Sequence, residues 1–210
     1  RVQQAVDELG YHPSDMARSL KSKRSCTLGI VGYGLEFFGP SCTISGIEQE
    51  ASELGYTLLL HLIRQPETNN VEELLERMQS RYVDGIMARV FVHSDLVQLA
   101  RWSSVPVING LSDLVHPCQG LTDLLTIQEK LGRLAGVRLT YVGDGNNIAN
   151  SWINLAGVLE LDLRLACPSG YEPDPKLLKQ ARAKNVSRIL LTEDPQQAVA
   201  DADVVYTDTW

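Results

Sequence analysis

The sequence predicts an α/β protein with two doubly wound parallel-sheet lobes. Short apolar runs alternate with amphipathic stretches along most of the 210 residues, and this alternation is typical of parallel sheets covered by helices. A long amphipathic stretch at residues 121–134 separates two such series. We therefore expect a long helix that links two lobes.

The N-terminal residues and the first series predict the elements of the first lobe. Two short helices are expected at 2–9 and 14–20, because Gly10 ends the first and Pro13-Ser14 opens the second. Residues 27–32 form an apolar run that ends in glycine, which indicates a buried strand. The further strands expected are 56–63, 83–88 and 105–108, and the helices are 41–54, 71–78 and 96–102.

The second series predicts four strands and three helices after the linking helix. The strands are expected at 137–142, 161–166, 188–191 and 204–206, and the helices at 147–159, 175–184 and 195–200. Both lobes would be flavodoxin-like or Rossmann-like. The expected domains are 1–25 for the N-terminal helices, 26–118 for the first lobe, and 119–210 for the linking helix and second lobe.

The net charge of −7 disfavours non-specific binding of nucleic acid by the whole chain. Residues 1–24 carry five basic and three acidic side chains, a local +2 that leaves −9 for the remainder. The apolar run at 57–63 is far too short to cross a membrane. The sequence starts within an expected helix without an initiator Met or a signal-peptide pattern, so we expect a fragment or an engineered chain.

The cysteines Cys26, Cys42, Cys118 and Cys167 are scattered, with no C-x-x-C pair and no His-rich segment. This spacing favours reduced thiols in a cytoplasmic protein over a disulfide framework or a zinc site. We expect no metal ion and no cofactor.

Three segments near the N-terminus carry a specific pattern: Arg-Val-Gln-Gln-Ala-Val-Asp-Glu-Leu-Gly-Tyr-His-Pro at 1–13, Ala-Arg-Ser-Leu at 17–20, and Arg-Ser-Cys-Thr-Leu-Gly-Ile-Val at 24–31. They resemble the lactose-repressor (LacI-type) family of transcription factors, and the resemblance continues weakly to about residue 78. It implies the last headpiece helix and a hinge helix, with Leu20 at the position that wedges into the DNA minor groove. The helix-turn-helix that would read the major groove is missing, so we expect no DNA binding. The alternative explanation of residues 1–24 is two solvated helices with ordinary surface charge.

The remainder carries a longer series of motifs. They are Ser-Arg-Tyr-Val-Asp-Gly-Ile-Met-Ala-Arg at 80–89, Ser-Val-Pro-Val-Ile-Asn-Gly-Leu-Ser-Asp-Leu-Val-His-Pro-Cys-Gln at 104–119, Tyr-Val-Gly-Asp-Gly-Asn-Asn at 141–147, Gly-Tyr-Glu-Pro-Asp-Pro at 170–175 and Asp-Val-Val-Tyr-Thr-Asp-Thr-Trp at 203–210. Together, in this order, they resemble the ornithine carbamoyltransferase family.

The resemblance implies a role for five residues. Arg89 matches the family's phosphate-binding arginine, which offers a forked donor. His116 and Gln119 match the catalytic H-P-x-Q pair that donates to the carbamoyl group of carbamoyl phosphate. Asn147 and Asp208 match the residues that bind ornithine. Four of these residues also have an ordinary structural alternative. His116 would cap a helix with Gln119 on its first turn, the Asn146-Asn147 pair would cap another helix, and Asp208 would lie in a loop.

Some groups of that family have no counterpart in the sequence. Its S-T-R-T-R phosphate loop corresponds to the turn at 32–43, which holds no arginine, and Val90 replaces the usual threonine. Its S-M-G and H-C-L-P segments would follow Trp210. We therefore expect a chimera joined near 78–84, with a partial carbamoyl phosphate and ornithine site and little or no catalysis.

Two other functions remain open: a repressor-derived domain that binds a small effector through the turn after the first strand, and an engineered scaffold without a ligand. Since the carbamoyltransferases are trimers, a homo-oligomer is also open.

Overall fold

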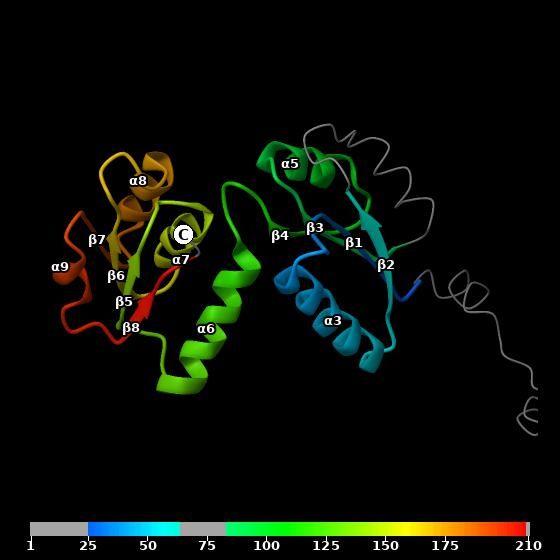
Figure 1. Cartoon of the computed structure of the whole chain (residues 1–210), viewed down its shortest axis with the longest axis horizontal. Helices are drawn as coiled ribbons and strands as arrows, with labels where there is room; N and C mark the ends of the chain where they lie inside the picture. Colours follow the sequence, from blue (N-terminus) through cyan, green and yellow to red (C-terminus); the bar gives the residue numbers. More distant parts are fainter. Residues whose placement is uncertain (1–24, 64–82, 209–210) are drawn as a thin grey trace, which may run out of the picture. The chain divides into compact units, whose positions relative to one another are not determined.

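The structure consists of two four-stranded parallel sheets with helices between their strands (Figure 1). The computed structural model describes residues 25–63 and 83–208. These residues form two compact units: the first extends to Arg89 and includes Val97–Ile108, whereas the second contains Val90–Leu96 and the chain from Asn109 onward. The predicted doubly wound α/β class is confirmed.

The first sheet is built from four strands and is accompanied by two described helices. The elements are β1 (Thr27–Gly32), α3 (Phe38–Glu53), β2 (Thr57–Leu62), β3 (Gly85–Arg89), α5 (His93–Trp102) and β4 (Val107–Leu111). The strand order is β2-β1-β3-β4, and β1 pairs in parallel with β2 and β3. The centre of this sheet is the best buried part of it, since Ile30, Val31 and Ile86 are at most 2% exposed.

The second sheet follows the same plan. The elements are α6 (Pro117–Leu131), β5 (Val137–Val142), α7 (Asn147–Ala156), β6 (Leu161–Ala166), α8 (Pro175–Lys184), β7 (Arg188–Thr192), α9 (Pro195–Val199) and β8 (Val204–Tyr206). The strand order is β7-β6-β5-β8, and all three pairings are parallel.

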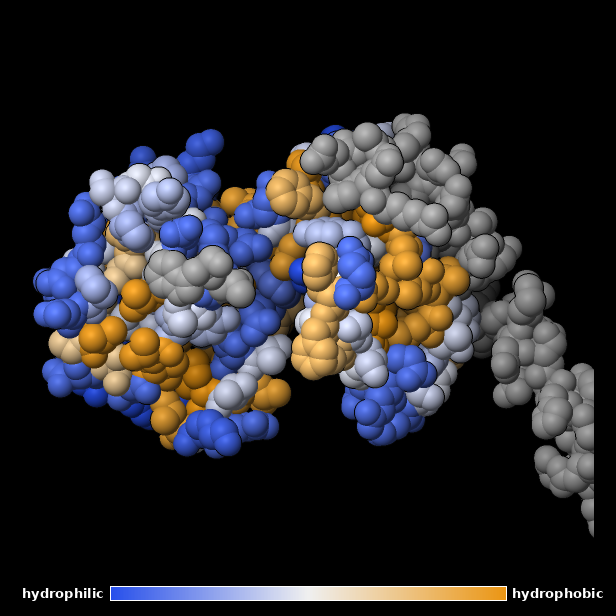
Figure 2. Space-filling view, in the orientation of Figure 1, coloured by the Kyte–Doolittle hydropathy of each residue, from blue (hydrophilic) through white to orange (hydrophobic). Residues whose placement is uncertain are grey.

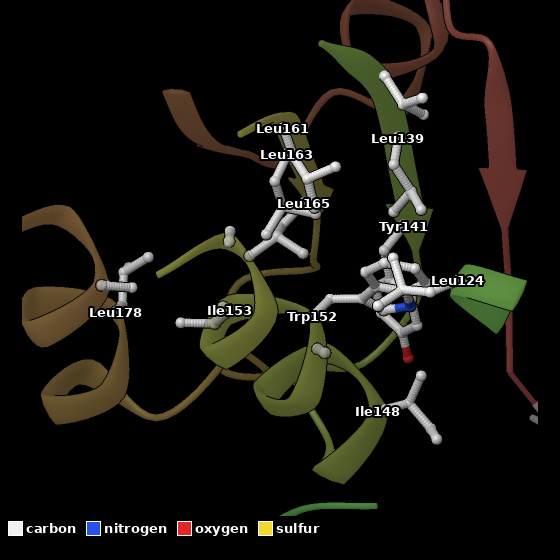
Figure 3. Packing of buried hydrophobic residues seen from close by; sticks show 14 of the residues in the cluster. Leu124, Leu139, Tyr141, Ile148, Trp152, Ile153, Leu161, Leu163, Leu165 and Leu178 are labelled. Atoms are coloured by element: carbon white, nitrogen blue, oxygen red, sulfur yellow. The ribbon is translucent and has the colours of Figure 1, made fainter. Parts of the chain in front are cut away.

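The core of the second unit lies between one face of this sheet and helices α6, α7 and α8 (Figure 3). Leu139 and Tyr141 of β5 and Trp152 of α7 are fully buried in it. Full burial of a large apolar side chain contributes roughly 1.5–3 kcal/mol. Thr140 points to the other face, where its Oγ1 donates to the carbonyl of Ala198 at 2.6 Å. Helix α9 therefore covers the opposite face, and the second unit has three layers.

In each sheet, later strands are added on both sides of the strand that comes first in the sequence. After β1 the chain adds β2 on one side and β3 on the other, and after β5 it adds β6 on one side and β8 on the other. The turns that leave such neighbouring strands diverge, so ligands of open α/β sheets bind at the carboxyl ends there. Four segments occupy these positions: 33–37 and the end of β3 in the first unit, and 143–147 and 207–208 in the second.

Several predicted boundaries were wrong. The linking helix begins at Pro117, four residues before the predicted start, because His116 caps it and Pro117 occupies its first turn. Strand β4 continues to Leu111 and takes in Asn109, which the prediction left outside the strand. Helix α3 begins at Phe38, three residues before the predicted start, and Leu54, the last residue of the predicted helix, is the C-cap residue and is 68% exposed.

Some predictions lie outside the described residues: the helices expected at 2–9, 14–20 and 71–78, the minor-groove role of Leu20, and Trp210. Within 25–63 and 83–208, no helix is long and apolar enough to cross a membrane. The same residues contain no cluster of three or more His, Cys, Asp or Glu side chains that could hold a metal ion.

Candidate functional site

Arg89 is the last residue of β3, at the switch point of the first sheet. Its guanidinium carbon lies 5.5 Å from the ring centroid of Tyr33, which directly follows β1. Its Nε is buried and has no hydrogen-bond partner among the described residues. A cation held over an aromatic face and short of one acceptor can bind an anion.

The turn between β1 and α3 forms a pocket of about 320 Å³ in the first unit. Glu36 is the charged side chain that lines it. Phe37 precedes α3 as its N-cap residue and makes no side-chain hydrogen bond to the helix. The pocket is lined by Tyr33, Gly34, Leu35, Glu36, Phe37, Leu62 and Ile63. No arginine or lysine side chain of this turn is therefore present to bind a phosphate.

In the second unit, His116 is the N-cap residue of α6. Its Nδ1 accepts the backbone N–H of Gln119 at 3.3 Å, and its own N–H donates to Oγ of Ser151 at 2.7 Å. A neutral imidazole whose Nδ1 accepts carries its proton on Nε2. The cap thus fixes the ring as an Nε2–H donor, so the predicted cap and the predicted ligand role are compatible.

Gln119 lies on the first turn of α6, and its Nε2 donates to Oδ1 of Asp123 at 2.9 Å. Burial raises the pKa of the Asp123 carboxyl, while its contacts with Gln119 and Tyr206 lower it. Tyr206, at the end of β8, has its phenol pKa raised by burial and by Asp123. These three side chains connect the start of α6 with the end of β8.

Hydrogen bonds fix the conformation of the turn after β5. Asn146 is the N-cap residue of α7, and its Oδ1 accepts the N–H groups of Ile148 and Ala149. The Tyr141 hydroxyl donates to the carbonyl of Asp144 at 2.8 Å. The Asn146 side chain also donates through Nδ2 to Oδ2 of Asp208 at 2.8 Å. The turn after β5 and the segment after β8 are therefore joined at the switch point.

Helix α7 also holds the loop that leads into α6. The side chains of Asn147 and Asn150 donate to the carbonyls of Ser112 and Leu114 at 2.8 and 3.1 Å. Next along the helix, Ser151 accepts the N–H of His116, as described above. Three polar side chains of one helix thus bind three groups of residues 112–116. The loop carrying His116 is positioned by the same helix that begins with Asn147.

The structure therefore brings four of the five predicted site residues into one network of the second unit: His116, Gln119, Asn147 and Asp208. Arg89 belongs to the first unit. The sequence reasoning missed Ser112, Asp123, Asn150 and Ser151 as residues that hold the site, whereas the Asn146 cap of α7 agrees with the predicted cap. Of the missed residues, only Asp123 had a local signal, because it lies four residues after Gln119 on one helix.

Comparison with known proteins identifies the family. The family model described as "Aspartate/ornithine carbamoyltransferase, carbamoyl-P binding domain" matches residues 43–129, and the model of the "Asp/Orn binding domain" matches 135–210. The solved ornithine carbamoyltransferase of Thermus thermophilus is 35% identical with a TM-score of 0.76, over 99% of this chain and 67% of that one. That of Burkholderia thailandensis is 31% identical with a TM-score of 0.77, over 93% and 68%. The chain belongs to the aspartate/ornithine carbamoyltransferase family.

Curated ornithine carbamoyltransferases match a shorter part of the chain more strongly. The protein of Geobacter sulfurreducens is 52% identical over 134 residues, and that of Thermococcus kodakarensis is 56% identical over 137 residues. Each match covers 64% of this chain and 44% of the relative, so it spans less than half of the relative's length. The carbamoyl-P model begins at residue 43, inside the segment for which a repressor resemblance was expected. These matches show the carbamoyltransferase family but no repressor portion.

Proposed function

We propose that this member of the carbamoyltransferase family binds a carbamoyl group at His116 and Gln119 and the amino acid ornithine at Asn147 and Asp208, with little or no turnover. The observation that carries the proposal is the orientation of the His116 ring. Because Nδ1 accepts the N–H of Gln119, Nε2 carries a proton toward any ligand at that face of the ring.

The chemistry explains why this donor matters. In carbamoyl transfer, the δ-amino nitrogen of ornithine attacks the carbamoyl carbon of carbamoyl phosphate. The bond from that carbon to the phosphate oxygen breaks, phosphate leaves with the electron pair, and the nitrogen loses a proton. Negative charge builds up on the carbamoyl oxygen during the attack, and an Nε2–H donor stabilises it.

The amino-acid end of the site rests on the switch point of the second sheet. Asp208 offers a carboxylate to an α-ammonium group, and its contact with Asn146 holds it beside the start of α7. Asn147 is the first residue of α7, where the positive end of the helix dipole favours the α-carboxylate of the same ligand.

Low turnover is proposed because the first unit lacks the arginines that the family resemblance implies for phosphate binding. The turn that follows β1 contains Tyr33, Glu36 and Phe37 instead of arginines. Each missing charge-assisted contact costs about 1.5–3 kcal/mol. Loss of two would weaken binding of the phosphate dianion by roughly two to four orders of magnitude. We expect Arg89, whose guanidinium lies over the Tyr33 ring, to provide the affinity for phosphate that remains.

The test is an assay of citrulline formation from carbamoyl phosphate and ornithine, paired with calorimetry of carbamoyl phosphate binding. We expect no citrulline at ordinary enzyme rates, and a weak binding heat that disappears in Arg89→Ala and decreases in His116→Ala. Arg101→Ala, which removes an exposed cation of α5, is the matched control. Citrulline formation at ordinary enzyme rates would disprove the proposal that the missing arginines reduce turnover. A binding heat that is absent, or equal in Arg89→Ala, would disprove the binding proposal.

One observation favours a second candidate function, a small-ligand site in the first unit. The pocket beside β1 combines aromatic and aliphatic walls with one carboxylate, Glu36. Its volume of about 320 Å³ lies at the lower end of the range for ligand pockets. Apolar side chains also gather on the visible surface of this unit (Figure 2), and Phe37 and Leu62 are 64% and 47% exposed. This combination suits a small apolar molecule that carries an amine.

Phenethylamine is a suitable probe for this pocket. Binding should shift the amide resonances of residues 33–37, and Glu36→Gln should weaken it, whereas Glu48→Gln on the exposed side of α3 should not. Absence of any shift at millimolar phenethylamine would remove the second candidate. If carbamoyl phosphate and ornithine also fail to bind, the remaining interpretation is a scaffold without a ligand.

The repressor-derived origin of the N-terminal part remains within the proposal. Its support is the sequence pattern through residue 31 and the replacement of the arginine-rich turn after β1. The residues that carry this pattern lie before residue 43, where the match to the carbamoyl-P binding domain model begins.

A further inference from the structure

The orientation of the Gln119 amide is fixed by its neighbour one helical turn later. Nε2 of Gln119 donates to Oδ1 of Asp123 at 2.9 Å. An ionised carboxylate can only accept, so the NH₂ end of the amide must face Asp123. The carbonyl oxygen Oε1 lies on the other side of the amide carbon, away from the hydrogen bond to Asp123, and among the described residues no hydrogen bond to this atom is observed.

Asp123 is itself held in place. It is half-buried on α6, and its Oδ2 is enclosed without a hydrogen bond of ordinary geometry. The Tyr206 phenol lies beside it at the end of β8. Tyr206 packs in turn against Tyr141 and Trp152, with ring centroids 6.0 and 6.1 Å apart. The enclosed Asp123 carboxylate therefore has few alternative positions. The same holds for the Gln119 amide that is hydrogen-bonded to it.

From this arrangement we propose that Asp123 is a positioning residue that makes Gln119 a hydrogen-bond acceptor, and so selects a ligand with an N–H group at this point. The inference rests on the proposed function, because it assumes that the acyl group binds beside His116 and Gln119. For Gln119 it replaces the sequence-based expectation of a donor with that of an acceptor. Carbamoyl phosphate provides an NH₂ group for Oε1. Acetyl phosphate has nearly the same shape but places a methyl group there, and leaves Oε1 without a donor.

The variant that tests the proposal is Asp123→Asn. It keeps the shape of the side chain, but an amide at this position no longer requires Gln119 to be the hydrogen-bond donor. The new amide either accepts from Nε2 of Gln119 or donates to its Oε1, so Gln119 no longer has one preferred orientation. Glu129→Gln is the control, since it removes one negative charge from an exposed position of the same helix.

The first measurement concerns the free protein. The Nε2 proton and nitrogen resonances of Gln119, assigned by their loss in Gln119→Ala, should shift in Asp123→Asn and stay unchanged in Glu129→Gln. Unchanged resonances in Asp123→Asn would overturn the positioning role. This result does not depend on whether any ligand binds.

The second measurement concerns selectivity. The ratio of the dissociation constants of acetyl phosphate and carbamoyl phosphate should fall roughly tenfold in Asp123→Asn, and remain as in the wild type in Glu129→Gln. A ratio that does not change would overturn the selective role, even if both affinities fall, because a general loss of structure weakens both ligands alike. If the wild type binds neither ligand, the proposed function and the selectivity fail together, and the amide resonances alone decide the orientation.

Discussion

Gly145 occupies a position in the turn after β5 where a side chain does not fit. A Cβ atom there would lie 2.1 Å from the nitrogen of Pro173 and 2.3 Å from the carbonyl carbon of Glu172. Its N–H also donates to the carbonyl of Tyr171 at 2.7 Å. Because the opposing atoms are backbone, they cannot rotate away. The glycine is therefore required for the approach of the two loops, independently of any role in binding.

Gly145→Ala should accordingly destabilise the second unit by about 2 kcal/mol or more, since the backbone of 171–173 must move. Gly46→Ala is the contrasting substitution, because a Cβ there meets nothing within 4 Å and the residue lies inside α3. It should stabilise the first unit by roughly 0.5–1 kcal/mol. Urea unfolding of both variants checks the two signs. A neutral Gly145→Ala would show that the loops do not approach as described.

The cysteines differ in their surroundings in a way that alkylation can measure. Burial, together with Asp144 and Glu172, raises the pKa of the Cys167 thiol to about 11. At pH 8 only about one in a thousand such thiols is ionised. Iodoacetamide should therefore modify the exposed Cys26 and Cys42 of the native protein well before Cys167. Mass spectrometry of digested samples checks this order, and unfolding in urea should make all sites react. Equal rates in the native protein would contradict it.

Among the structural elements, α7 has the largest share in forming the site. Its inner face contributes Ile148, Trp152 and Ile153 to the core. Its polar side chains bind the loop at 112–116. Asn150 uses both ends of its amide: Nδ2 donates to the carbonyl of Leu114, and Oδ1 accepts the N–H of Asp174 at 3.0 Å. One buried amide thus connects the loops that precede α6 and α8.

Asn150→Asp should keep the contact with Asp174 and lose the one with Leu114, because a carboxylate cannot donate. We expect a loss of about 1–3 kcal/mol in the free energy of unfolding, since the partly buried carbonyl of Leu114 loses its donor and a carboxylate replaces the buried amide. Asn154→Asp, at an exposed position of the same helix, should change it by at most about 0.5 kcal/mol. Urea titration of both variants provides the comparison. Similar losses in the two would indicate that charge, and not the contact with Leu114, is responsible.

The same helix shows which parts of the site could be predicted from sequence. The caps formed by His116 and Asn146 bind groups two or three residues away, so the local pattern of residues is sufficient to indicate them. The contacts of Asn147 and Asn150 with the 112–116 loop span 35 and 36 residues. Such contacts depend on how the helix packs on the sheet, which apolar periodicity does not encode. The type and order of the described elements and the two helix caps were predictable, whereas the residues of α7 that hold the 112–116 loop were not.

At the scale of the molecule, charge and burial set the pH range in which the second unit is stable. Asp203, just before β8, accepts from Arg138 at 2.9 Å and from Arg133 at 3.1 Å. The Arg138 guanidinium lowers the pKa of the Asp203 carboxyl well below its ordinary value of 3.8. At the alkaline end, burial raises the pKa of Tyr141 and Tyr206 above the ordinary value of 10.0. Ionisation of these phenols therefore opposes folding.

A lowered carboxyl pKa contributes stability above the ordinary value, and this contribution is lost as the pH falls from about 3.8 toward the lower pKa of the folded state. Asp203→Asn should therefore be less stable than the wild type at pH 6, and the difference should shrink below about pH 4. Glu193→Gln, an exposed carboxyl of the same unit, reports the effect of net charge alone. Urea unfolding between pH 2.5 and pH 7 measures the difference. A difference that is constant with pH would exclude the ion pairs as its source.

The three packed aromatic rings of the second unit have a spectroscopic consequence. Tyr141, Trp152 and Tyr206 hold one another in a fixed, asymmetric arrangement within the core. Chromophores so arranged couple their electronic transitions and give circular dichroism in the near ultraviolet. One of them neighbours Asp123 and another hydrogen-bonds the turn after β5. The protein therefore carries an intrinsic optical probe whose signal should respond when a ligand rearranges either end of the site, without any attached label.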